Sequence, residues 1–330
     1  MRSDGMVILA GLSGTGKSQL VKCYGNALKL PHEQVKFVSV ESNWTDDSDL
    51  MGFYDPTSNK YYPGKSGLVD KLLDAEQNPE KLYIIVFDEM NLSKVEQYFS
   101  QFLSVLEMDK GSREITLYDS GTKDNHYPNK IKIGDNVFFV GTINTDESTY
   151  KFSDKVLDRT NVIKLGMQEF TLFNTKHSEE PWEGSTISSY QYAQMGQSNQ
   201  DKKLKDNELN LLWNLHKDIN SVEPNVGIGW RVVNQIDNYM SNLPEQIGKF
   251  QGLDYQINQR VMTKISGSDQ QLNELLGQSN IKDQGGTIYQ SLGKYLKAEE
   301  SNKKVEDVFK KTLETVDKKR KDLVIYGYTI

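Results

Sequence analysis

A glycine-rich segment near the start of the chain carries residue types suited to binding phosphate. Residues 11–18 match the spacing G-x-x-x-x-G-K-[ST]. Lys17 would reach the terminal phosphates of a nucleotide, and the Ser18 hydroxyl would occupy one position on Mg²⁺. The pattern predicts that ATP or GTP binds here as substrate with Mg²⁺ as cofactor, at Gly11, Leu12, Ser13, Gly14, Thr15, Gly16, Lys17, Ser18 and Gln19.

The flanks of this segment have the composition that a phosphate-binding loop needs. Residues 6–10 are a short apolar run, typical of a buried parallel strand, and residues 19–28 carry apolar side chains at helical spacing. The glycines therefore fall where a strand turns into a helix, whose free N–H groups and dipole favour an anion. A chance glycine-rich turn, the alternative, would lack this context.

Two adjacent carboxylates follow a second apolar run, residues 82–87. The carboxyl ends of strands in an open α/β sheet form the edge where ligands bind. Asp88 would hold Mg²⁺ through water opposite Ser18, and Glu89 would orient and activate the attacking water. Alone, this pair could equally be a solvated turn. Together with the phosphate loop, it predicts a nucleoside triphosphatase.

Composition limits the class of protein. The chain has 330 residues, enough for two domains or subdomains, and 36% hydrophobic with 26% charged residues is typical of a soluble globular protein. We expect no membrane association, because no apolar run approaches bilayer length. The single cysteine, Cys23, fits a reducing cytoplasm, and we expect it to be buried on the helix after the loop.

The net charge of −7 argues against a broad surface for the phosphate backbone of DNA. If the protein acts on DNA, other chains or domains would provide much of the contact with the DNA. The chain begins only a few residues before its first expected strand, which suggests a piece of a longer polypeptide.

The remaining pattern predicts a parallel α/β core followed by helices. Residues 1–166 would form the nucleotide-binding subdomain, 167–200 a connecting segment and 201–330 an α-helical lid. The core would contain an insertion at 41–67 and a β-hairpin at 114–133. Further strands are expected at 35–40, 136–143 and 162–165, core helices at 68–75 and 95–107, and lid helices at 204–219, 230–243, 253–265 and 305–321.

The insertion at 41–67 contains several aromatic residues beside lysines. These aromatic rings could stack on nucleic-acid bases, or they could pack together and stabilise the insertion, which we favour. They are Trp44, Phe53, Tyr54, Tyr61 and Tyr62.

Taken in order, these features resemble the AAA+ ATPases. The set comprises the phosphate loop, Asp88-Glu89, a strand ending in Asn144, Leu157-Asp158-Arg159 and Gly229-Trp230-Arg231. The sequence from Phe87 to Asn91, together with the insertion and the hairpin, resembles that of the McrB-related and MoxR-like branch. McrB is the nucleotide-driven motor of a modification-dependent restriction system.

The resemblance implies roles for three further side chains. Asn144 would be the sensor that polarises the water or the γ-phosphate, and Arg231 a second sensor on the lid. Arg159 would be an arginine finger that reaches a neighbour's nucleotide, a contribution of roughly 10³–10⁵ in rate in related enzymes. The structural alternatives are a surface salt bridge for Arg159 and a helix-terminal role for Arg231.

An arginine finger implies a homo-oligomeric ring, a hexamer in this family. The hairpin would then face the pore with Tyr118, Lys123, His126 and Tyr127, although a plain surface hairpin is equally compatible. The leading hypothesis is the motor of a restriction or phage-defence system with an McrC-like nuclease partner. A MoxR-like protein-remodelling ATPase and a nucleotide-switched scaffold are the alternatives.

One departure from the family pattern leaves open whether the nucleotide substrate is ATP or GTP. McrB proteins usually carry Met-Asn-Thr-Ala-Asp at the sensor, where this chain has Ile143-Asn144-Thr145-Asp146-Glu147. McrB prefers GTP, whereas most AAA+ proteins use ATP.

Overall fold

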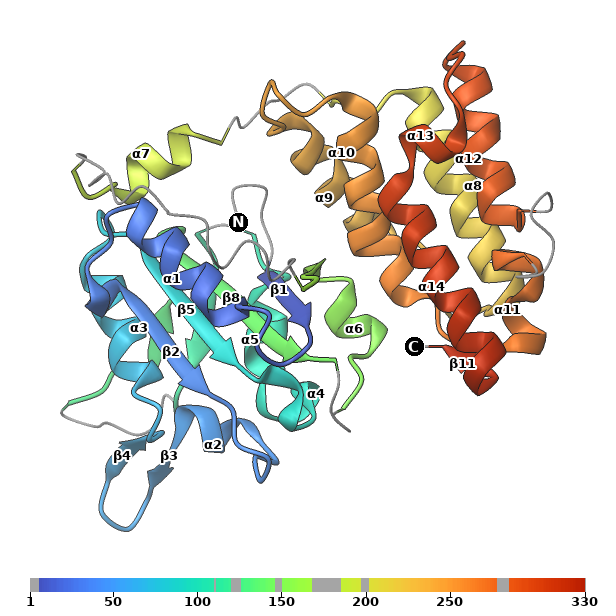
Figure 1. Cartoon of the computed structure of the whole chain (residues 1–330). Helices are drawn as coiled ribbons and strands as arrows, with labels where there is room; N and C mark the ends of the chain where they lie inside the picture. The colour runs from blue at the N-terminus through green and yellow to red at the C-terminus, as the bar shows by residue number, and fades with distance from the viewer. Residues whose placement is uncertain are drawn as a thin grey trace. The chain divides into compact units, whose positions relative to one another are not determined.

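The computed structural model describes residues 6–109, 111–119, 126–145, 150–167, 185–196, 202–277 and 285–329. The chain divides into two compact units, one formed by Gly5–Met195 and the other by Gly196–Ile330 (Figure 1). The division falls inside the segment 167–200 that was expected to connect them.

The first unit is built on a five-stranded parallel sheet with the order β2-β5-β8-β1-β9. The inner strands β1 and β5 are buried on both faces, which explains why they read as continuous apolar runs in the sequence. The predicted α/β core is therefore confirmed. Its strands are β1 (Met6–Gly11), β2 (Val35–Ser39), β5 (Tyr83–Asp88), β8 (Val137–Asn144) and β9 (Thr160–Lys164).

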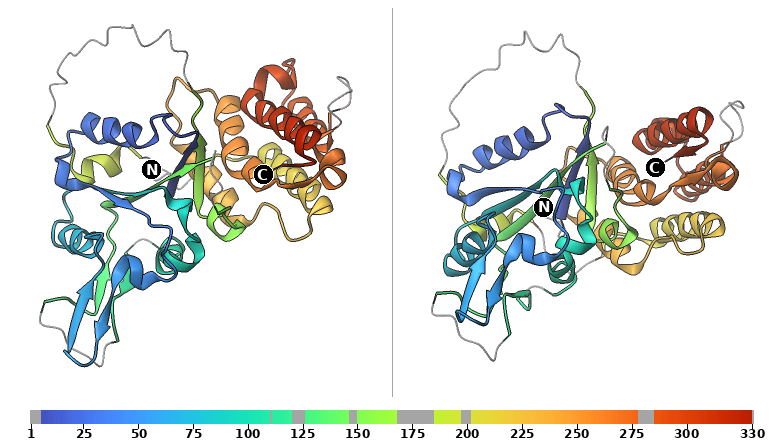
Figure 2. Two further views of the ribbon diagram at one scale, coloured as in Figure 1. Left: turned by 60° about the horizontal axis from the view of Figure 1, so that its bottom comes forward. Right: turned by 90° about the horizontal axis from the view of Figure 1, so that it is seen from below.

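Helices cover both faces of this sheet (Figure 2). On one face, α1 (Lys17–Ala27) and α7 (Ser189–Gln194) pack through Val21 and Tyr192 onto apolar strand residues. The segment containing α7 thus belongs to the sheet unit. The other face is covered by α3 (Leu68–Gln77), α4 (Val95–Tyr98) and α5 (Ser100–Val105).

The helix expected at 95–107 is divided in two. Phe99 has φ −110° and ψ 16° between α4 and α5, and its ring stacks on Phe102 with centroids 4.8 Å apart. Phe87, the residue before Asp88, packs edge-on against Phe99 at 4.7 Å. The aromatic cluster therefore supports the strand that carries the two carboxylates.

The insertion and the predicted hairpin both form. The insertion contains α2 (Asp47–Met51) and the antiparallel strands β3 (Gly52–Asp55) and β4 (Lys60–Pro63). The hairpin pairs β6 (Glu114–Thr116) with β7 (Lys130–Lys132). The shorter elements of this unit are η1 (His32–Gln34), η2 (Met90–Leu92) and α6 (Asp154–Leu157).

The aromatic residues of the insertion divide between two environments. Tyr61 is buried and packs against Tyr118 and Tyr127 of the hairpin region at 5.8 and 5.3 Å between centroids. Phe53 and Tyr62 stack on each other at 5.7 Å and are exposed. The favoured packing role is thus confirmed for Tyr61, whereas Phe53 and Tyr62 pack on each other while remaining exposed.

The second unit is helical around its own core (Figure 1). The predicted lid helices correspond to α8, α9, α10 with two short turns, and α13 with α14, whereas α11 and α12 were not predicted. The elements are α8 (Asp206–Val222), α9 (Trp230–Ser241), α10 (Lys249–Gln256), η4 (Ile257–Val261), η5 (Met262–Lys264), β10 (Gly267–Ser268), α11 (Asp269–Leu276), α12 (Thr287–Ala298), α13 (Val305–Val308), α14 (Lys310–Tyr326) and β11 (Tyr328–Thr329).

A buried polar cluster joins three helices of this unit. Glu208 is 1% exposed, and it accepts hydrogen bonds from Tyr295 Oη at 2.9 Å and Lys249 Nζ at 2.5 Å. Lys249 also pairs with Glu299 at 2.8 Å. Because a buried carboxylate is stable only when it is paired and hydrogen-bonded, these contacts fix how α8, α10 and α12 meet.

None of the helices in the described part of the chain is both long and apolar enough to cross a membrane.

Candidate nucleotide site at the carboxyl edge of the sheet

The loop between β1 and α1 has a backbone that requires glycine at two positions. Gly14 and Gly16 have φ of 79° and 82°, in the left-handed region that costs other residues about 1–2 kcal/mol. Gly11 is restricted by space, since a Cβ there would lie 2.8 Å from both the Leu165 carbonyl oxygen and Thr15 Oγ1. The two fixed glycines of the sequence pattern, Gly11 and Gly16, therefore have separate structural reasons, and Gly14 at a variable position shares the reason of Gly16.

Lys17 is held within the loop that it follows. Its side chain is buried, and Nζ donates hydrogen bonds to the carbonyl oxygens of Gly11 at 3.0 Å and Leu12 at 2.8 Å. Thr15 Oγ1 also donates to the Leu12 carbonyl, at 2.9 Å. The lysine charge is thus fixed beside the start of α1, where backbone N–H groups favour an anion.

Asp88 meets two hydroxyl groups at the end of β5. Ser18 Oγ donates to Asp88 Oδ1 at 2.8 Å, and Thr142 Oγ1 donates to the same oxygen at 2.6 Å. Ser18 and Asp88, which were predicted to hold Mg²⁺ from opposite sides, thus contact each other directly across 70 residues of sequence. Thr142 is a residue that the sequence reasoning missed.

Glu89 has an unusual backbone conformation. Its φ of 56° and ψ of 45° are left-handed, which is uncommon outside glycine. Strict alternation along β5 would direct Glu89 to the face opposite Asp88. The left-handed turn instead lets Glu89 Oε1 accept a hydrogen bond from Asn144 Nδ2 at 3.3 Å. Glu89 and the predicted sensor are therefore together.

The turn after Glu89 is anchored by buried side chains. Asn91 Nδ2 donates to the Asn144 carbonyl oxygen at 3.0 Å, and Tyr98 Oη donates to the Met90 carbonyl oxygen at 2.8 Å. Burial raises the pKa of Tyr98 well above its ordinary value, so the phenol stays protonated and keeps donating. These contacts hold the turn that follows Glu89 against Asn144 and against α4.

The oxygen atoms near Ser18 fit magnesium. Mg²⁺ prefers hard oxygen ligands and is commonly held by one or two protein oxygens plus substrate phosphates and water. Ser18 Oγ and Asp88 Oδ1 provide such a pair. No cluster of three His, Cys, Asp or Glu side chains that could hold a metal occurs within the described ranges.

Arg159 lies in a different environment from the one expected of an arginine finger. Its side chain is 7% exposed and forms an ion pair with Glu107. Its Nε donates to the Leu103 carbonyl oxygen at 3.2 Å, and a terminal nitrogen donates to the Lys155 carbonyl oxygen. The guanidinium therefore joins β9, α5 and α6 within its own subunit.

The other predicted contact residues are dispersed. Arg231 is exposed on the first turn of α9, in the helical unit. Among the hairpin candidates, His126 is exposed, whereas Tyr118 is buried and donates to the Tyr127 carbonyl oxygen at 2.6 Å. Lys123 lies outside the described residues.

The expected burial of Cys23 is wrong. The cysteine is exposed on the outer side of α1, and Gln19 Nε2 approaches its Sγ at 3.7 Å.

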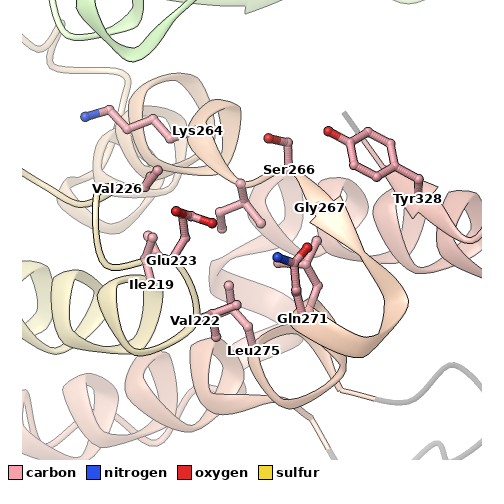
Figure 3. Close-up of a pocket in the computed structure, with 12 residues that line it drawn as sticks. Ile219, Val222, Glu223, Val226, Lys264, Ser266, Gly267, Gln271, Leu275 and Tyr328 are labelled. Carbon is pink, nitrogen blue, oxygen red and sulfur yellow. The ribbon is translucent and has the colours of Figure 1, made fainter.

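A pocket of about 270 Å³ lies in the helical unit, between the end of α8 and the turn before α11 (Figure 3). Its lining includes Val222 and Leu275, with the Glu223 carboxylate among them. Lys264 Nζ points away and donates to the Gly227 carbonyl oxygen at 2.9 Å. The pocket contains none of the residues expected to bind nucleotide.

Comparisons with known proteins divide the chain in a similar way. Residues 6–160 match the model of the AAA domain, dynein-related subfamily. Residues 181–328 match a domain of unknown function, DUF8727.

One curated relative and one solved structure are similar to this chain. The EcoKMcrB subunit of the type IV methyl-directed restriction enzyme from Escherichia coli K12 is 23% identical over 159 residues, which cover 46% of this chain and 33% of that subunit. The chain thus matches about a third of the length of this relative. A crystal structure of a candidate ATPase from Cytophaga hutchinsonii has a TM-score of 0.48 at 14% identity, covering 80% of this chain and 78% of that one. Residues 6–160 therefore match an AAA domain, and the chain is similar to the McrB subunit over 159 residues.

Proposed function

We propose that this protein hydrolyses a nucleoside triphosphate at the edge formed by Ser18, Asp88, Glu89 and Asn144. The observation that carries the proposal is the pair of contacts Ser18–Asp88 and Asn144–Glu89, which join three segments far apart in the sequence. A phosphate loop alone would support binding. A carboxylate held beside an amide at the same edge supports turnover.

Each group has a distinct role in this proposal. The loop N–H groups and Lys17 bind the phosphates, and Ser18 with Asp88 holds Mg²⁺, which neutralises charge on the phosphate oxygens when bound. Glu89 accepts a hydrogen bond from the attacking water and orients it toward the γ-phosphate. Asn144 orients the Glu89 carboxylate and polarises the water or the γ-phosphate.

We further propose that the protein acts as a ring-forming motor of a McrB-like restriction or phage-defence system. The similarity to the E. coli restriction-enzyme subunit supports this role, and the net charge of −7 favours DNA contacts through other chains or domains, with an McrC-like nuclease as partner. In such a ring, Arg159 and Arg231 would approach nucleotide. Arg159 would first have to exchange its contacts with Glu107 and two carbonyl groups.

Two alternative functions predict different behaviour of nucleotide hydrolysis and assembly. A MoxR-like remodelling ATPase would use the same chemistry but be stimulated by a protein client. A nucleotide-switched scaffold would assemble on binding and release little phosphate.

The test is Mg²⁺-dependent phosphate release with ATP and GTP in parallel, over a range of protein concentrations. We expect turnover with one base preferred, and specific activity that rises with concentration as subunits assemble. Added double-stranded DNA and an added nuclease subunit then separate the motor from the remodelling ATPase. Assembly with nucleotide but without phosphate release would favour the scaffold instead.

A further inference from the structure

Thr142 is a buried polar residue that none of the roles above includes. It lies on β8, two residues before Asn144, and is 1% exposed. In the sheet, Thr142 pairs with Leu9 of β1, and its neighbour Gly141 pairs with Phe87 of β5. The register therefore brings Thr142 beside Asp88, with both side chains on the same face.

The Thr142 hydroxyl contacts both acidic residues at once. It donates its hydrogen to Asp88 Oδ1 at 2.6 Å and accepts the backbone N–H of Glu89 at 3.0 Å. The directions are fixed, because a carboxylate can only accept and a backbone N–H can only donate. One hydroxyl satisfies both requirements, since it carries one hydrogen and two lone pairs.

These two bonds have separate consequences. At Asp88, the bonds from Thr142 and Ser18 to one oxygen fix the rotation of the carboxylate. At Glu89, the bond holds the amide of a residue in the left-handed conformation, which turns its side chain toward Asn144. A strained backbone persists only where surrounding contacts fix it.

We propose that Thr142 is a positioning residue that sets both the metal-holding carboxylate Asp88 and the water-orienting carboxylate Glu89. The proposal rests on the proposed function, because it deepens the roles assigned there to these two groups. Thr142 itself touches neither phosphate nor water in this reading. It acts through its hydroxyl, and its methyl group has no part in the effect.

The chain offers a matched control for the chemistry of this contact. Thr312 is also fully buried, and its Oγ1 donates to Asp254 Oδ1 at 2.7 Å. This Thr–Asp pair lies within the helical unit and contains none of the predicted site residues. Thr312→Val therefore removes the same kind of hydrogen bond without touching the nucleotide site.

The experiment compares Thr142→Val, Thr142→Ser and Thr312→Val with the unmutated chain. Valine preserves the shape and removes the hydroxyl, whereas serine preserves the hydroxyl. The first readout is the affinity for Mn²⁺ in the presence of ADP, measured by electron paramagnetic resonance. The second is ADP affinity in EDTA, and the third is phosphate release as a function of Mg²⁺.

We expect Thr142→Val to weaken Mn²⁺ binding about 10–100-fold, the usual effect of losing a group that orients a metal ligand. Its ADP affinity in EDTA should stay within about threefold, since the phosphate loop is unchanged. Thr142→Ser should restore Mn²⁺ affinity to within about threefold, and Thr312→Val should leave it unchanged. The Mg²⁺ concentration for half-maximal phosphate release should rise in parallel in Thr142→Val only.

Unchanged Mn²⁺ affinity in a folded Thr142→Val protein would overturn the proposal, as would a serine variant as defective as the valine one. Failure of the proposed function is distinguishable from either result. If the unmutated chain binds Mn²⁺ and ADP but releases no phosphate, the hydrolytic proposal fails. The Mn²⁺ comparison then still decides the role of Thr142.

Discussion

Replacement of Arg159 by alanine should destabilise the sheet unit. In the structure, the guanidinium pairs with Glu107 and donates to the carbonyl oxygens of Leu103 and Lys155. Alanine leaves all three acceptors without this donor. The prediction therefore concerns folding as well as catalysis, and the two effects must be measured separately.

The magnitude follows from the exposure of each acceptor. The Glu107 side chain is 38% exposed, so its carboxylate can rehydrate, and loss of the ion pair contributes only about 0–1 kcal/mol. Leu103 is fully buried, and leaving its carbonyl oxygen unpaired costs about 1–3 kcal/mol. With the Lys155 carbonyl and the lost packing of the arginine stem, the free energy of unfolding should fall by about 2–4 kcal/mol.

Hydrogen exchange is the suitable assay, because it reports on one unit of the chain at a time. Protection should fall in peptides covering residues 100–107 and 154–164, on α5, α6 and β9. Glu107→Gln is the control, since it removes the ion pair but keeps the arginine and its bonds to the carbonyl groups. It should lower stability by at most about 1 kcal/mol.

Unchanged protection in Arg159→Ala, together with lost turnover, would refute this reasoning. Mixing Arg159→Ala subunits with Glu89→Gln subunits then tests the arginine finger itself. If Arg159 acts on a neighbour's nucleotide, the mixture regains activity at interfaces where an intact Glu89 faces an intact Arg159. A mixture that remains inactive would mean that Arg159 has a structural role only and is not an arginine finger.

Two further predictions concern the loop and the helical unit. Gly16→Ala should weaken nucleotide binding, because φ of 82° costs alanine about 1–2 kcal/mol although space for the Cβ is open. Gly248→Ala, with φ of −68° and equally open space, should leave affinity for ADP unchanged in the same titration. Hydrogen bonds from Lys249 and Asn207 hold the pKa of Glu299 below its ordinary value of 4.5. The ionised Glu299 carboxylate therefore stabilises the folded state above pH 4.5, and this stabilisation is lost as the pH falls through the lowered pKa. When the pH is lowered from about 6 to about 3, the free energy of unfolding of the helical unit, measured with urea, should therefore fall less in Glu299→Gln than in the unmutated chain.

The sequence predicts the sheet and the loop because their causes are local. Strands buried on both faces need continuous apolar runs, and residues 82–87 and 137–141 provide them. The positive φ at Gly16 likewise follows from a fixed motif position. The Ser18–Asp88 contact could be anticipated because both residues lie at the carboxyl edge of one parallel sheet.

Other features depend on register and tertiary contacts that no local pattern carries. Thr142 reaches Asp88 only because β8 pairs beside β5, and Glu89 turns toward Asn144 through a backbone conformation that glutamate rarely adopts. The burial of Arg159 depends on the end of α5 lying beside it. A signal for Thr142 was present in the sequence, namely a polar residue in an otherwise apolar strand two positions before Asn144.

The central claim, hydrolysis at the edge of the sheet, is tested most directly by replacing Glu89. Phosphate release and nucleotide affinity should be measured for Glu89→Gln beside Glu33→Gln, an exposed carboxylate on η1. The account predicts that Glu89→Gln lowers kcat by at least about 100-fold while nucleotide affinity is retained, and that Glu33→Gln matches the unmutated chain. Turnover in Glu89→Gln near the unmutated level would contradict the role of Glu89 and, with it, the proposed mechanism.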